Sequence, residues 1–194
     1  MAKASTNSQA KTLSKAFPTS VVLVGQIALL LIVGFTATWL HYRFRFPLNM
    51  PGRHGLEFML LIMGARYLST LRLSATIAVI GSVLASLIPV LGFKDPMLPY
   101  IYIGIGAFID FAWYRWSAFR NWIPLAALLG GLAYGIIPLV RLFFMLVGSY
   151  PYGSFAKHGY VIPFLTHIAF GFTGAFAGVG LLSEITKRTS KKSK

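Results

Sequence analysis

Long apolar runs, broken by short polar or proline-containing segments, are the feature that most limits how this chain can fold. The run at 20–40, SVVLVGQIALLLIVGFTATWL, contains no charged residue. A helix that crosses the hydrocarbon core of a bilayer needs about 20 mostly apolar residues. Further runs approach that length at 54–69, 73–91, 97–114, 122–147 and 160–182. Because these runs are continuous rather than alternating, they predict an all-α integral membrane bundle of six transmembrane helices.

The low charge content excludes a soluble domain. Charged residues make up 11% of the 194 residues, and hydrophobic residues make up 56%. A soluble domain carries about 25% charged residues to cover its wetted surface. The length predicts a single transmembrane domain at 20–182, between a basic tail at 1–19 and a second basic tail at 183–194. The chain has no cysteine, which excludes disulfides and thiolate metal sites.

The distribution of the basic residues predicts the orientation. With six spans, one side of the membrane collects twelve Lys and Arg residues, including both tails, and the other side collects five. An excess of basic residues marks the cytoplasmic side. We therefore expect a multi-pass protein of the cell inner (cytoplasmic) membrane with both termini in the cytoplasm. The net charge of +14 is explained by basic segments flanking apolar spans, so we do not expect a nucleic acid partner.

The second run is short and carries charge at both ends. It lies in PGRHGLEFMLLIMGARYLS, residues 51–69, which begins with Arg53, His54 and Glu57 and closes with Arg66. Its apolar part is too short to fill a bilayer. It therefore predicts a helix packed inside the bundle, with its outer end contributing to a pocket.

Two acidic residues fall within predicted spans and need partners. An ionisable group inside a membrane costs at least about 2.5 kcal/mol and usually faces the bundle interior or a cavity. Counting depth from each end of the spans pairs Glu57 with Arg141 in an outer layer. The same count pairs Asp110 with Arg66 in an inner layer. Either these ion pairs only lock the helices together, or Glu57 or Arg141 also faces a ligand.

Small residues recur at four-residue spacing, which lets helices approach closely. The third run has the most regular stripe, formed by Ser74, Ala78, Ser82 and Ser86. The first and sixth runs have further small residues at this spacing. Such stripes predict either packing within the chain or a docking surface for another membrane subunit.

Neither a metal site nor a catalytic motif is strongly indicated. His54 and Glu57 lie three residues apart, and His158 lies in another outer loop, so these are weak metal candidates. We assign no metal and no cofactor. The sequence has no phosphate-binding glycine motif, nucleophile elbow or zinc-protease motif. We therefore assign no catalytic residue, and the sequence leans away from an enzyme.

The whole architecture resembles a known family. Six helices in a chain of this length, small-residue stripes, and outer loops rich in aromatics at 41–53 and 148–160 are similar to the substrate-binding S component of energy-coupling-factor vitamin transporters. Gly34 and Thr38 in the first run stand where that family uses a small-residue stripe against its scaffold subunit. The resemblance implies uptake of a small, vitamin-like solute together with a scaffold subunit and two ATPases.

In that interpretation the solute binds near the outer face under the two outer loops. Tyrosines could stack on a flat ring while charged groups hold its polar atoms. The candidate ligand-binding residues are Arg53, His54, Glu57, Arg141, Tyr150, Tyr152 and Tyr160. Two alternatives stay open. One is a membrane enzyme acting on lipid or quinone, with His54 and Glu57 as acid and base. The other is a structural or accessory subunit of a membrane complex.

Overall fold

The computed structural model describes residues 19–43, 50–93, 95–148 and 152–192, and these ranges form helices and no strand. The elements in chain order are α2 (Thr19–Arg43), α3 (Gly55–Leu68), α4 (Ser74–Ser86), the 3-10 helix η1 (Pro89–Leu91), α5 (Leu98–Arg115), α6 (Ala118–Asn121), α7 (Ile123–Tyr134), α8 (Ile136–Gly148), α9 (Gly153–His158) and α10 (Val161–Lys192). The predicted all-α class is confirmed.

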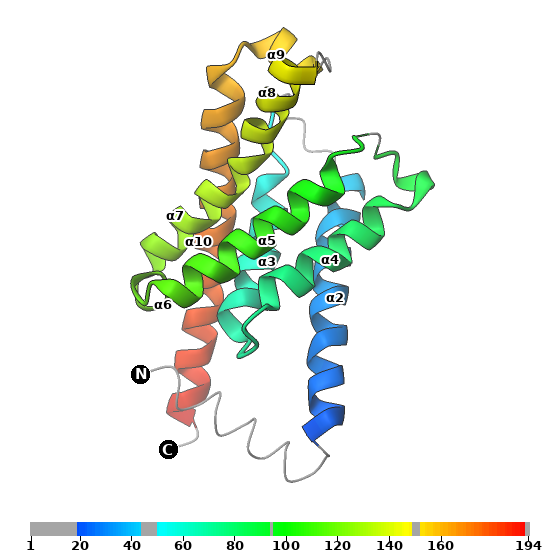
Figure 1. Ribbon diagram of the computed structural model, residues 1–194. Helices are drawn as coiled ribbons and strands as arrows, with labels where there is room; N and C mark the ends of the chain where they lie inside the picture. Colours follow the sequence, from blue (N-terminus) through cyan, green and yellow to red (C-terminus); the bar gives the residue numbers. More distant parts are fainter. Residues whose placement is uncertain (1–18, 44–49, 94, 149–151, 193–194) are drawn as a thin grey trace.

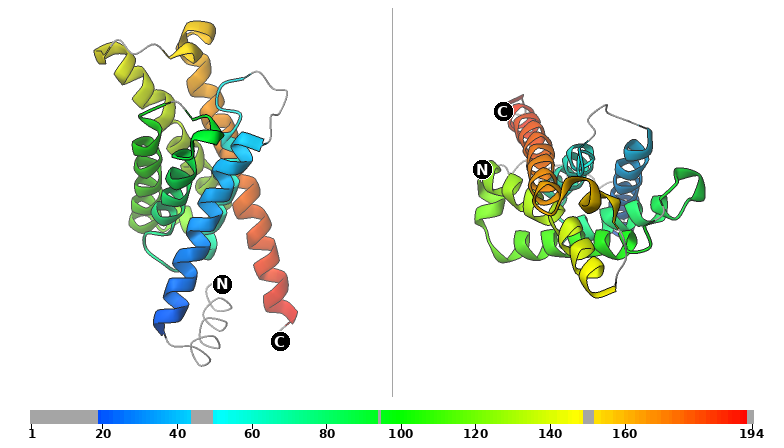
Figure 2. Two further views of the ribbon diagram at one scale, coloured as in Figure 1. Left: turned by 90° about the vertical axis from the view of Figure 1, so that its right-hand side faces the viewer. Right: turned by 90° about the horizontal axis from the view of Figure 1, so that it is seen from above.

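Two long helices flank the bundle (Figures 1 and 2). α2 has 25 residues and α10 has 32 residues. α3 packs against both of them, α4 packs between α2 and α5, and α7 packs along α10. The first residues of α2 and the last residues of α10 lie at one end of the molecule, and α9 lies at the opposite end (Figure 1).

Three helical segments are long and apolar enough to cross a membrane: Thr19–Arg43, Ile123–Gly148 and Val161–Lys191. Their outward faces carry large apolar side chains, such as Val24 and Ile32 of α2 and Leu165 of α10, which are each more than half exposed. Apolar side chains on an outer surface suit contact with lipid tails. The three helices therefore indicate a membrane-embedded protein.

Six full spans are not seen in the described part of the chain. α3 and α4 contain 14 and 13 residues. At 1.5 Å per residue, each is roughly 20 Å long, whereas the hydrocarbon core is about 30 Å thick. α5 has 18 residues, but its tyrosines, Asp110 and Arg115 lower its hydropathy. The apolar runs at 54–69, 73–91 and 97–114 are thus helical without being long apolar spans.

α3 occupies the interior of the bundle, as the short charged run predicted. Phe58, Met59, Ile62 and Met63 are almost completely buried. α3 packs against α10, α2, α4 and α7, so one short helix holds the longer helices together.

Proline positions explain several helix boundaries. Pro99 and Pro124 stand in the first turns of α5 and α7, where a missing N–H costs nothing. Pro138 lies four residues after Tyr134, so it cannot donate to the Tyr134 carbonyl and its ring crowds that carbonyl. The predicted run at 122–147 accordingly breaks between α7 and α8, at Gly135.

The C-terminal basic segment is a continuation of α10. The helix passes the predicted boundary at 182 and runs to Lys192. Lys187, Arg188 and Lys191 therefore lie on a rigid helix that extends beyond the bundle (Figure 1).

Candidate functional site

An open hollow of about 400 Å³ lies where α2 ends and α3 begins. Three chain segments line it. The last turn of α2 contributes His41 and Tyr42, and the turn before α3 contributes Arg53 and His54. The segment that follows α4 contributes Leu91, Gly92 and Phe93. Polar and aromatic groups from distant parts of the sequence therefore converge at one end of an apolar bundle.

A tight turn fixes the position of Arg53 and His54. Gly52 has a φ of +78°, which glycine adopts without strain. The Gly55 amide donates to the Gly52 carbonyl at 2.8 Å, which closes the turn. A Cβ atom on Gly52 would lie 2.6 Å from the ring of His167, so the turn packs directly on α10. Any larger residue at this position would displace the lining of the hollow.

Arg53, His54 and Glu57 form one hydrogen-bonded chain. Arg53 Nε donates to His54 Nε2 at 3.2 Å. Because Arg53 can only donate, His54 Nε2 is the acceptor and the ring proton sits on Nδ1. Nδ1 then donates to Glu57 Oε1 at 2.7 Å. This arrangement fixes the tautomer of His54 and holds the Glu57 carboxylate behind it, away from the hollow.

The imidazole of His41 lies on that of His54. Their ring centroids are 3.6 Å apart and the rings are nearly parallel. The ring of Phe93 also packs against His41, with ring centroids 5.2 Å apart. We call His41, Arg53, His54, Glu57 and Phe93 the histidine cluster. The sequence did not predict His41 or Phe93 as site residues, although a histidine in the last turn of an apolar helix was a usable signal.

The other oxygen of Glu57 has no partner among the described residues. Glu57 Oε2 is buried and accepts no hydrogen bond there. Buried polar atoms are nearly always bonded, so an exception needs a reason. The next residue, Phe58, packs between the rings of Tyr102 and Tyr134, with ring centroids 4.8 Å and 5.9 Å away.

The predicted pair between Glu57 and Arg141 is wrong. Arg141 Nη2 instead lies 2.8 Å from Asp95 Oδ2, and the Arg141 guanidinium lies over the ring of Tyr152 at 5.4 Å. Asp95 also accepts from the Met97 amide at 3.0 Å, which fastens the start of α5. Glu57 takes His54 because the two residues are one helical turn apart.

The remaining predicted ligand residues do not line the hollow. Tyr160 is 57% exposed and its ring contacts Phe155. Tyr152 lies beside Arg141, and Tyr150 lies outside the described residues. The weak metal candidates do not assemble either. Across the described ranges, no group of three or more His, Cys, Asp or Glu residues could hold a metal ion, so His54, Glu57 and His158 do not form such a group.

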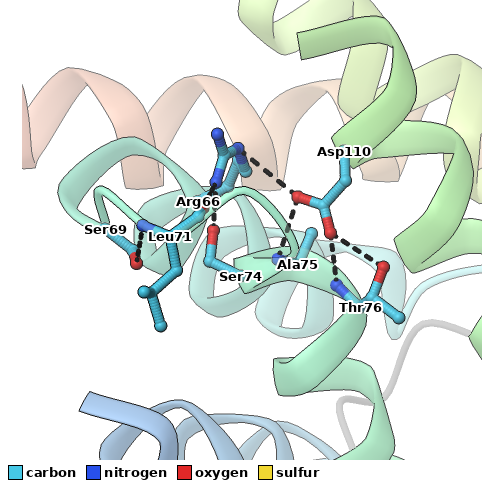
Figure 3. Close-up of polar contacts among 7 residues, drawn as sticks. All are labelled: Arg66, Ser69, Leu71, Ser74, Ala75, Thr76 and Asp110. Atoms are coloured by element: carbon cyan, nitrogen blue, oxygen red, sulfur yellow. Dashed lines mark hydrogen bonds and ion pairs between the residues drawn. The ribbon is translucent and has the colours of Figure 1, made fainter. Parts of the chain in front are cut away.

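The predicted inner pair is present (Figure 3). Arg66 Nε lies 3.4 Å from Asp110 Oδ1, and both side chains are buried. Asp110 also accepts from the amides of Ala75 at 3.2 Å and Thr76 at 2.8 Å. Asp110 therefore caps the N-terminus of α4 from a neighbouring helix.

Arg66 completes this network on the other side. It donates to the Leu71 carbonyl at 2.5 Å and to the Ser74 hydroxyl, and it lies over the ring of Trp113 at 5.6 Å. Both charged groups are thus used in joining α3, α4 and α5. This arrangement fits a structural lock rather than a binding site.

Comparisons with known protein families, with curated proteins and with solved structures found no match.

Proposed function

We propose that this chain is a membrane-embedded substrate-binding subunit for the uptake of a small solute, and that the hollow beside the histidine cluster is its binding site. The single observation that carries the proposal is the hollow itself. Its walls combine aromatic rings with a few convergent polar groups, the usual composition of a small-molecule site. Its volume of about 400 Å³ falls within the range of roughly 300–1,000 Å³ typical of such sites.

The proposed orientation puts the hollow at the outer face. The start of α2 and the end of α10 lie at the same end of the molecule, and the α10 end carries Lys187, Arg188 and Lys191 (Figure 1). The positive-inside bias supports a cytoplasmic location for that end. His41 lies in the last turn of α2, away from the start of that helix, and His54 directly precedes α3 beside it. In the proposed orientation an external solute would reach this end of the molecule first.

The proposed partners are a membrane scaffold subunit and ATPases, as in energy-coupling-factor transporters. The sequence motifs of a phosphate-binding loop are absent from the chain, so energy for uptake would come from partner subunits. The vitamin-like character of the solute rests on the architectural resemblance alone.

Release of a bound solute tests the proposal. The protein would be purified in mild detergent and denatured, and the released small molecules would be identified by mass spectrometry. We expect one solute near equimolar amounts for the natural protein. His54→Ala removes one ring from the lining and both hydrogen bonds that hold Arg53 and Glu57 in place, and it should reduce the bound solute at least about tenfold, a loss of about 1.4 kcal/mol of binding free energy.

Lys157→Gln is the matched control because Lys157 is exposed and does not line the hollow. It should retain the solute fully. Purification of the natural protein without any bound solute, or full retention of the solute by purified His54→Ala, would contradict the proposal. Copurification of an ATPase pair would favour a transporter subunit over a structural or accessory subunit.

A further inference from the structure

We infer that the hollow selects a planar organic anion. This inference rests on the proposed function and specifies the chemical class of its solute. The first argument is charge. Of the described residues that line the hollow, Arg53 carries a full positive charge and none is a carboxylate. An anion is therefore favoured at this wall, and a cation has no partner among these lining groups.

The acidic residues nearby are already used. The Glu57 side chain is only 11% exposed, and Glu57 Oε1 lies 2.7 Å from His54 Nδ1. Asp95 is held by Arg141 at 2.8 Å and by the Met97 amide at 3.0 Å. Neither carboxylate belongs to the lining of the hollow. Both carboxylates are therefore engaged by other groups, and Arg53 is the lining residue that carries a full charge.

The second argument is shape. Four of the lining residues have rings, namely His41, Tyr42, His54 and Phe93. The His41 and His54 rings are stacked at 3.6 Å, and the Phe93 ring packs on His41 at 5.2 Å, so three of these rings form one aromatic group. Flat rings pack best against flat rings, in offset or edge-to-face geometry. A solute with a ring and one anionic group therefore matches both the aromatic lining and the positive charge of Arg53.

The hydrogen bonding of His54 sharpens the role of Arg53. The Nε–H of Arg53 donates to His54 Nε2 at 3.2 Å, and this bond orients the Arg53 guanidinium relative to the rest of the histidine cluster. A lysine at this position would keep the charge but lose the planar, fixed donor geometry of the guanidinium. The two substitutions Arg53→Gln and Arg53→Lys therefore separate charge from orientation.

Three matched probes test the inference on the purified, solute-free protein in detergent. Benzoate is planar and anionic, benzamide is planar and neutral, and cyclohexanecarboxylate is anionic but not planar. Dissociation constants would be measured by calorimetry at millimolar probe concentrations. We expect benzoate to bind at least about tenfold more tightly than either of the other two, since a charge-assisted contact and ring packing each contribute that much.

The variants give the second readout. Arg53→Gln should abolish the preference for benzoate over benzamide, whereas Arg53→Lys should keep the preference with weaker binding. Lys157→Gln removes one positive charge at an exposed position outside the hollow and should bind like the natural protein. Equal binding of benzoate and benzamide, or no binding of any probe, would overturn the inference. Equal binding of cyclohexanecarboxylate and benzoate would overturn its planar part.

The proposed function and this inference fail in distinguishable ways. If the natural protein releases a neutral or cationic solute that His54→Ala loses, the proposed function stands and the anion inference is wrong. If the protein neither releases a solute nor binds any probe, both are wrong. If Arg53→Gln elutes as aggregated protein, the binding of benzoate and benzamide to Arg53→Lys decides whether the charge at position 53 selects an anion.

Discussion

Buried and exposed charges have different roles in this protein. Arg66 and Asp110 are almost fully buried, and hydrogen bonds from two backbone amides and a threonine hydroxyl satisfy the carboxylate. Arg188 and Glu184 also form an ion pair, but their side chains are 77% and 55% exposed. Removal of one partner from a buried pair leaves an uncompensated charge, whereas an exposed pair contributes little.

Asp110→Asn should destabilise the protein by about 3–5 kcal/mol, because it leaves Arg66 without its counter-charge. The new amide also places a donor where Asp110 Oδ2 accepts from the Thr76 amide and hydroxyl, both at 2.8 Å. Addition of Arg66→Gln removes the stranded charge and should restore part of the loss. Reversible unfolding in detergent would measure all three variants.

The control for this cycle is Glu184→Gln, which should change the unfolding free energy by less than about 0.5 kcal/mol, since its pair is exposed to solvent. A double variant that is as unstable as the sum of the two single variants would show that Arg66 and Asp110 do not interact.

Helix contacts in this bundle depend on small residues that let backbones meet. The stripe of Ser74, Ala78, Ser82 and Ser86 faces the protein interior, and the Ser82 hydroxyl donates to the Gly34 carbonyl of α2 at 2.7 Å. This finding decides between the two interpretations of the stripe in favour of packing within the chain. A Cβ atom on Gly34 would lie far too close to the Ala78 carbonyl oxygen of α4.

Gly34→Ala should therefore force α2 away from α4 and cost about 1–3 kcal/mol of stability, the usual penalty for overpacking. Gly25→Ala on the same helix is the matched control, because a Cβ atom there would have no neighbour within 4 Å. It should be neutral or stabilising by up to about 1 kcal/mol, since alanine is the better helix former. Equal melting temperatures for the two variants would show that α2 and α4 are not in close contact.

At the scale of the whole molecule, long helices enclose short ones. α2, α10 and the kinked pair α7–α8 are apolar enough to cross a bilayer, while α3 lies among them with its side chains buried. A short helix inside a bundle needs no lipid contact along its length, so its charged ends can stay near the two rims. Accordingly, Glu57 of the histidine cluster lies in the first turn of α3 and Arg66 lies in its last turn.

Cysteine labelling tests the orientation of the whole molecule. The natural chain has no cysteine, so Ser5→Cys and Ser190→Cys each introduce a single reactive thiol. With both termini in the cytoplasm, an impermeant thiol reagent should leave both positions unlabelled in intact cells and should label both after permeabilisation. Labelling of either variant in intact cells would overturn the proposed orientation. The expectation comes from the basic residues at both ends of the chain, since an excess of basic residues marks the cytoplasmic side.

The helical class and the membrane setting followed from the sequence, because they depend on the length and polarity of local runs. For the run at 54–69 the helix and its interior position were correctly predicted, because charged ends disfavour contact with lipid, but the run is not one of the three helices long enough to span a membrane. Arg66 and Asp110 could be paired because both residues lie near the inner ends of their predicted runs. The cap that Asp110 forms at the start of α4 was not predicted, because it depends on the approach of another helix.

Only the tertiary structure decided which groups meet at the hollow. The sequence periodicity indicates the face of a helix on which a residue lies, but it does not identify the helix that covers this face. Asp95, in a short connection, reaches Arg141 because α5 and α8 are neighbours, and Glu57 is left to His54. His41 stacks on His54 because the end of α2 packs beside the start of α3. Such contacts depend on helix rotation and on approach within a few ångströms, and neither is encoded in local composition.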